Sequence, residues 1–93
     1  MVLEGEFKYL KLERRERKES EKLKEENKYY YILNLLDEEN NPVKFYSFNY
    51  ETSAKLIDIC KDIKSLQDVL VKFSLEFSNN NWNVRLIDVS AQY

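Results

Sequence analysis

Histidine is absent from this 93-residue sequence, and glycine, proline and cysteine occur once each. Without histidine, the chain lacks the side chain that ordinarily exchanges a proton near neutral pH. It also lacks a glycine-rich phosphate loop, a CxxC pair and an HExxH motif. We therefore expect no enzyme activity, no metal site and no cofactor. The single cysteine, Cys60, excludes an intramolecular disulfide and fits a reducing compartment.

Long apolar runs are also missing. None approaches the roughly 20 residues that span a membrane, and the first residues have neither the basic nor the apolar region of a secretory signal. These absences predict a cytoplasmic protein with no membrane partner. The length is that of one domain, residues 1–93. Plentiful Lys, Asn, Ile and Tyr are typical of an AT-rich coding genome, such as those of low-GC bacteria, their phages and mobile elements.

Charge is distributed unevenly although the net charge is only −2. Eleven of the thirteen residues at positions 14–26 are charged, and three of the four arginines lie at positions 14–17. Such a segment favours helix by propensity, but it has no apolar stripe with which a helix could dock. We therefore predict an exposed excursion at about residues 14–27, formed either as an extended hairpin arm or as a frayed helical loop.

Alternating apolar residues predict five strands, at residues 6–13, 28–36, 43–48, 69–77 and 82–89. In the first strand the apolar parity shifts at Leu10, which predicts a bulge or a strong bend. In the second, Tyr30 and Ile32 are expected to share the outer face with Asn34. Residues 37–42 and 78–81 are turns by composition.

One helix is predicted between the third and fourth strands. Thr52 or Ser53 can cap its N-terminus, and it should end near Lys64. Its apolar positions fall on one face, so Cys60 is expected to be a small buried residue. These positions are Leu56, Ile57, Cys60 and Ile63.

This element order, from residue 6 to about residue 89, resembles an OB-fold, a five-stranded Greek-key barrel with a helix between strands three and four. We therefore expect a mainly β, OB-fold-like barrel in the order β-β-β-α-β-β. Similar architecture is found in small single-stranded-DNA-binding proteins of phages and mobile elements. Because Gly5 is the only glycine, the sequence leaves open whether the barrel closes.

The resemblance also implies a binding surface. OB-folds commonly bind ligands on the face of strands two and three, between the loops that join strands one to two and four to five. Single strands need cations along a groove and flat rings on which bases stack. The residues of this sequence that would supply them are Arg14, Arg15, Arg17, Lys18, Tyr30, Lys44, Tyr46, Lys72, Trp82 and Arg85.

Each of these features also has a plain structural interpretation. A tyrosine-rich strand at residues 29–31 is often half core and half ordinary surface. The arginine cluster can pair with the neighbouring acids on a solvated arm, and Trp82 can plug the end of the barrel. Our prediction is an accessory protein of a phage or mobile element that binds single-stranded nucleic acid, with DNA favoured over RNA.

Two further hypotheses stay open at this point. One is a small phage or mobile-element protein that inhibits or adapts a host protein through protein–protein contact, which the size, the acidic pI and the charged segment fit equally well. The other is a homodimer formed when edge strands pair between two copies.

Overall fold

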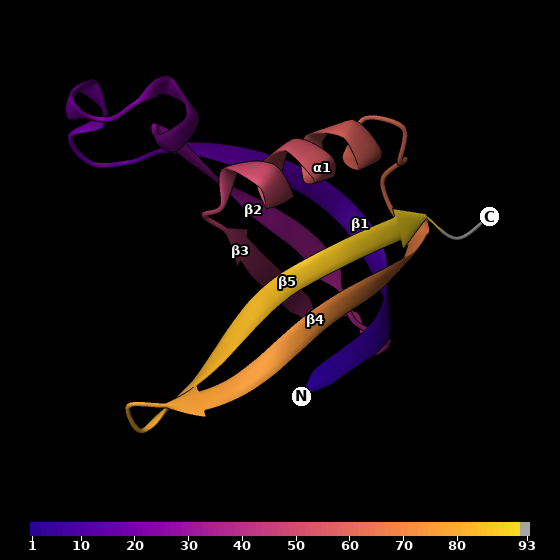
Figure 1. The fold of residues 1–93 in the computed structure, drawn as a ribbon. Helices are drawn as coiled ribbons and strands as arrows, with labels where there is room; N and C mark the ends of the chain where they lie inside the picture. The colour runs from indigo at the N-terminus through magenta and orange to yellow at the C-terminus, as the bar shows by residue number, and fades with distance from the viewer. Residues whose placement is uncertain (92–93) are drawn as a thin grey trace.

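The computed structural model describes residues 1–91, in which five antiparallel strands form one sheet and one α-helix packs against it (Figure 1). The strand order in the sheet is β3-β2-β1-β4-β5. The predicted mainly β class and the order β-β-β-α-β-β are confirmed. The elements are β1 (Val2–Glu16), β2 (Tyr29–Leu36), β3 (Pro42–Ser47), α1 (Tyr50–Cys60), β4 (Asp68–Ser78) and β5 (Asn81–Ala91), with two short 3-10 helices, η1 (Ser20–Lys22) and η2 (Glu25–Asn27), before β2.

The sheet does not close into a barrel, which answers the question that the sequence left open. Strands β3 and β5 are its two edges, and within residues 1–91 no strand pairing joins them. The two strands nevertheless approach each other. Tyr46, Phe48 and Thr52 line one small cavity together with Arg85 and Leu86. Side chains therefore occupy the space between β3 and β5, which we call the seam. In a closed barrel, backbone hydrogen bonds would join the two strands there.

The predicted irregularity in the first strand is confirmed. Strand β1 changes register between Tyr9, which pairs with Leu35, and Lys11, which pairs with Asn34. Leu10 is the extra residue, and the shift lets Tyr9 and Leu12 both pack on the core side of the sheet. The bulge therefore accommodates the shift in apolar pattern that the sequence contains.

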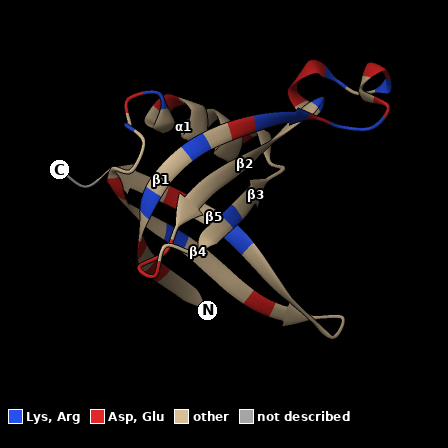
Figure 2. Cartoon of the chain, turned by 180° about the vertical axis from the view of Figure 1, so that it is seen from behind, with Lys and Arg blue, Asp and Glu red and all other residues tan. Residues whose placement is uncertain are grey.

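Strand β1 is longer than predicted and shortens the charged excursion. Residues 14–16 pair with residues 29–31 of β2 instead of leaving the sheet. The excursion begins at Arg17, whose backbone N–H donates to the Lys28 carbonyl at 2.8 Å. It contains the two short 3-10 helices and no α-helix. Figure 2 shows basic and acidic residues intermixed along this loop, which we call the charged loop, residues 17–28.

Helix α1 begins earlier than predicted because Asn49 caps it. The Asn49 Oδ1 atom accepts a hydrogen bond from the Thr52 backbone N–H at 3.1 Å. The helix ends at Cys60 rather than near Lys64, and Ile63 packs on the core from the following turn. The apolar face that the sequence predicted thus extends past the end of the helix.

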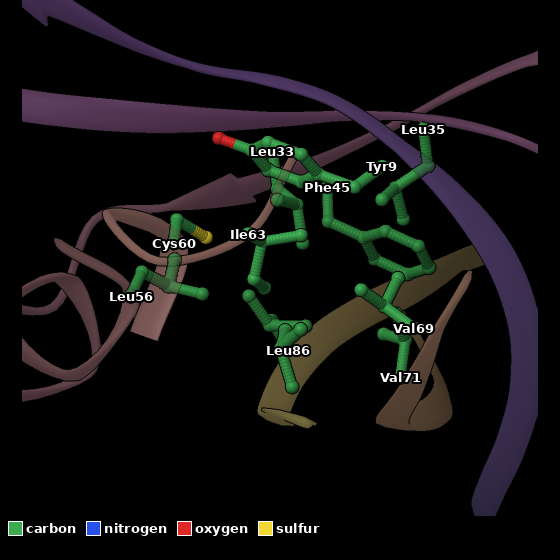
Figure 3. Close-up of a cluster of buried hydrophobic side chains, with 11 residues drawn as sticks. Tyr9, Leu33, Leu35, Phe45, Leu56, Cys60, Ile63, Val69, Val71 and Leu86 are labelled. Atoms are coloured by element: carbon green, nitrogen blue, oxygen red, sulfur yellow. The ribbon is translucent and has the colours of Figure 1, made fainter. Parts of the chain in front are cut away.

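The core lies between α1 and the inner face of the sheet (Figure 3). Leu33, Leu35, Val69 and Val71 are completely buried. Cys60 is buried as predicted, and burial raises the pKa of its thiol. Burial also raises the pKa of Tyr9, to about 12, and the adjacent Cys60 contributes to that shift.

Among the residues that the structure describes, no helix is long and apolar enough to cross a bilayer. The cytoplasmic location stays a prediction.

Candidate nucleic-acid interface

The outer face of strands β1, β2 and β3, which points away from α1, presents its side chains in regular rows. Strand register places Glu13, Ile32 and Tyr46 in one row. The next row toward the charged loop begins with Arg15 and Tyr30 and continues at Phe48, one residue beyond β3. On the other side lies the row of Lys11, Asn34 and Lys44. The predicted sharing of this face by residues 30, 32 and 34 agrees with the register.

Three aromatic rings gather on this face, and we call them the aromatic triad: Tyr30, Tyr46 and Phe48. The Tyr30 ring centroid lies 5.1 Å from that of Phe48 and 6.5 Å from that of Tyr46. The Tyr46 and Phe48 centroids are 6.2 Å apart, and their planes differ by only 11°. Tyr46 is 49% exposed and Phe48 58% exposed. Two of the three rings are therefore accessible from solvent on this face of the sheet.

Arginines border the triad on two sides. The Arg17 guanidinium carbon lies 5.5 Å from the centroid of the Phe48 ring, and its Nη2 donates to the Phe48 carbonyl at 2.6 Å. Arg85 reaches the same region from β5, because it lines the seam cavity with Tyr46 and Phe48. Arg15 lies beside Tyr30 in the adjacent strand. Cations thus surround the exposed rings.

One carboxylate, that of Glu13, lies among these cations. It accepts hydrogen bonds from Asn34 Nδ2 at 2.9 Å and from Arg15 Nη2 at 3.2 Å, and Lys11 Nζ lies 3.8 Å away. The Arg15 hydrogen bond, followed by that of Asn34, lowers the pKa of Glu13. Glu13 therefore stays ionised at neutral pH and offsets part of the charge of Arg15.

The structure does not bring all the predicted residues to this face. Arg14 faces the helix side, where its guanidinium carbon lies 4.5 Å from the centroid of the Tyr29 ring. Lys18 lies exposed in the charged loop. Lys72 is on β4, opposite Glu4 in β1 and Asp88 in β5, two strands away from the triad. The predicted arginine cluster is therefore divided between the two faces of the sheet.

Trp82 lies at the tip of the β4–β5 hairpin and does not plug the core. It is 64% exposed, and its ring centroid lies 5.3 Å from that of Phe77 on the neighbouring strand. In Figures 1 and 2, the end of β3 lies between this hairpin and the charged loop. The triad is thus flanked by the two connections that the OB-fold resemblance implied.

Phe48 is the aromatic residue of this site that the sequence reasoning did not select, and Lys11 and Glu13 were not selected either. The sequence does contain a pattern that could have identified Phe48. Lys44, Tyr46 and Phe48 are spaced two residues apart, so their side chains point to one face of an extended segment. Phe48 was assigned to the third strand but was not recognised as a partner of Tyr30, although that pair has the shortest centroid distance in the triad.

Fold and site together define a small, mainly β protein with an open five-stranded sheet and an exposed aromatic and basic outer face. Comparisons with protein-family models, with curated proteins and with solved structures find no match to the chain. The function is therefore argued from the geometry of the site.

Proposed function

We propose that this protein binds single-stranded nucleic acid through the aromatic triad. The observation that carries the proposal is the arrangement of Tyr30, Tyr46 and Phe48 on one sheet face, with neighbouring centroids 5.1–6.5 Å apart and two of the three rings exposed. Each stacked base is worth about 1–3 kcal/mol on such a ring. Unpaired bases can stack on such rings, whereas paired bases in a duplex present no free ring face.

The local charge supports the same proposal. Five cations lie in or beside the three rows, against the single carboxylate of Glu13. A phosphate backbone that passes the triad would meet positive charge on both sides, although the whole chain carries a net charge of −2. These cations are Lys11, Arg15, Arg17, Lys44 and Arg85.

The connectivity of the sheet is a third line of support. The order β3-β2-β1-β4-β5 is that of an OB-fold barrel opened between β3 and β5. In that architecture the face of strands two and three binds single strands, with the loops on either side as walls. A role as an accessory protein of a phage or mobile element, with DNA favoured over RNA, belongs to the same proposal.

Fluorescence anisotropy with a labelled ~20-nucleotide single strand, at low and at physiological salt and with a duplex control, tests the proposal. We expect saturable binding that weakens with salt and prefers the single strand. Tyr46→Ala should weaken it. Tyr50→Ala is a matched control, because Tyr50 is similarly exposed, at 56%, but is not part of the triad. Absence of binding at low salt, or equal loss in both variants, would refute the proposal.

A separate observation favours contact with a protein partner. The β4–β5 hairpin exposes Phe77, Trp82 and Val84 by 60%, 64% and 53%. Adjacent exposed apolar side chains of this size are typical of interaction surfaces. If the protein inhibits or adapts a host protein through this hairpin, capture of that protein should survive nuclease treatment. It should be lost in Trp82→Ser and retained in Tyr46→Ala.

A further inference from the structure

A cavity that could hold a ligand lies on the helix side of the sheet, opposite the aromatic triad. It is a cavity of about 150 Å³ between β2, η2 and the first turns of α1. Three tyrosines and two glutamates are among the residues that line it. The lining side chains are Tyr29, Tyr31, Tyr50, Glu25 and Glu26, with Ser53, Ala54 and Ile57 along the helix.

The chain builds this cavity from three separate elements. Tyr29 and Tyr31 alternate on the helix-facing side of β2, at the end of the strand that extends beyond the core. Tyr50 is the first residue of α1, and Glu25 and Glu26 are the first residues of η2. The rings therefore come from the sheet and the helix, while the carboxylates come from the charged loop.

This combination of groups favours a cation. The face of an aromatic ring carries negative partial charge, so several rings around one space attract an ammonium or guanidinium group. The carboxylates of Glu25 and Glu26 add formal negative charge at the same place. The volume is that of a cavity that holds one benzene-sized guest, and it is below the roughly 300 Å³ of pockets for drug-sized ligands. A small cationic head group fits these limits.

Two cationic side chains of the protein itself already contact residues that line this cavity. The Arg14 guanidinium lies over the Tyr29 ring at 4.5 Å, and Lys28 Nζ lies 3.2 Å from Glu25 Oε2. Glu26 forms no ion pair among residues 1–91. One carboxylate thus stays available to an incoming cation.

The N-terminus of α1 acts in the opposite direction, because its partial positive charge favours an anion. One backbone N–H group at that end already has a hydrogen-bond partner, since Asn49 Oδ1 accepts from the Thr52 N–H. The acidic residues Glu25 and Glu26 line the same cavity and disfavour an anion. The balance favours a cation, and an anion belongs among the probes of the test.

We propose that this cavity binds the head group of an organic cation, an ammonium or guanidinium ion, with the tyrosine rings around it and Glu26 as its counter-charge. Two sources can supply this chemistry: a free small amine, or a lysine or arginine side chain of a protein. The site is independent of the triad, so it holds whether or not the protein binds nucleic acid.

An NMR chemical-shift titration with choline, and in parallel with its neutral isostere 3,3-dimethylbutan-1-ol, tests the proposal. We expect saturable millimolar binding of choline with shifts confined to residues lining the cavity, and no saturation with the neutral alcohol. Inorganic phosphate should cause no such shifts. Equal binding of choline and the alcohol would make the cavity a plain apolar pocket and overturn the proposal. Binding of phosphate would also overturn it. So would the absence of any binding by choline and by the alcohol.

Variants identify the groups that act. Tyr50→Ala should weaken choline binding roughly 3- to 10-fold, as expected for loss of one cation–π contact. Tyr50→Phe keeps the ring and should bind like the wild type. Glu26→Gln should also weaken binding, whereas Tyr46→Ala on the opposite face should not. Because Tyr50 and Glu26 are exposed, these variants are expected to fold. Unchanged binding in both Tyr50→Ala and Glu26→Gln would show that the site is elsewhere.

Peptides distinguish the two sources. A peptide that contains trimethyllysine should bind more tightly than the free amino acid if the natural ligand is a protein side chain, because flanking residues add contacts. Equal affinity for peptide and free amino acid would indicate a small amine. Failure of either form to compete with choline would contradict a shared site and overturn the assignment.

Discussion

Arg17 fastens the charged loop to the end of β3 through Phe48. Its guanidinium lies over the Phe48 ring and its Nη2 donates to the Phe48 carbonyl at 2.6 Å. The charged loop is therefore held against the aromatic triad by this contact, although 30 residues separate Arg17 from Phe48 in the chain. This link determines how changes in the loop reach the proposed interface.

The first prediction concerns that link. Arg17→Ala removes a charge-assisted hydrogen bond and a cation–π contact, so we expect the free energy of unfolding to fall by about 1–2 kcal/mol. Urea denaturation measures the change. Lys18→Ala is the control, since Lys18 is exposed and should alter stability by less than about 0.5 kcal/mol. Equal effects of the two substitutions would show that the Arg17 contacts do not stabilise the loop.

The second prediction concerns the missed member of the triad. Phe48→Ala should weaken single-strand binding by about 1–3 kcal/mol, roughly 5- to 150-fold, because a stacking ring is lost. Phe48→Tyr keeps the ring and should bind within about twofold of the wild type. Anisotropy titrations at constant salt compare the two variants. A similar loss in both would contradict a stacking role for the Phe48 ring.

The third prediction concerns the carboxylate beside the triad. Glu13→Gln removes the negative charge that offsets Arg15, so we expect single-strand affinity to rise at neutral pH by roughly twofold or more. Glu38→Gln, at the turn before β3, removes the same charge far from the triad and should have little effect. If both variants bind alike, the gain reflects net charge alone and not the Glu13 site.

The pH dependence of Glu13 follows from its lowered pKa. A carboxyl group with a lowered pKa in the folded state contributes its full stability above the ordinary carboxyl pKa. That contribution is lost as the pH falls through the lowered value. Between mildly acidic and neutral pH, Glu13 should therefore change neither stability nor affinity. A difference between wild type and Glu13→Gln that varies across this range would contradict the assignment.

The sequence predicted local features of this fold better than it predicted whether the sheet closes into a barrel. The bulge at Leu10 was predictable because the apolar parity shifts there, and Tyr30 and Tyr46 followed from strand alternation. The cap at Asn49 was missed because Thr52 and Ser53 are equally good capping residues. Local chemistry leaves several neighbouring positions equivalent, and only packing of the helix selects one.

The composition of the site depended on contacts that no local pattern encodes. Arg14 and Arg15 are adjacent, yet the two faces of β1 separate them once β1 continues to Glu16. Arg85 approaches Tyr46 only because the sheet coils until β5 comes near β3. Twist and coiling of a whole sheet are summed over many residues, so the open seam could not be predicted from strand positions alone.

The fourth prediction uses the buried Tyr9 hydroxyl. Its pKa is raised from about 10 in the unfolded chain to about 12 in the folded protein, chiefly by burial. Below about pH 10 the hydroxyl is neutral in both states and the stability is complete. As the pH rises from about 10 to 12 the unfolded chain ionises first, so the free energy of unfolding should fall by about 2 kcal/mol. Urea denaturation across this range measures the loss.

Tyr9→Phe isolates that contribution from the titration of other residues. The variant keeps the ring in the core but has no ionisable hydroxyl at this position, so its stability should decline less over the same pH range. Burial also raises the pKa of the Cys60 thiol, which lies beside Tyr9, so Cys60→Ala in the same background separates the two groups. If Tyr9→Phe loses as much stability as the wild type between about pH 10 and 12, the Tyr9 hydroxyl must be accessible to solvent in the folded protein.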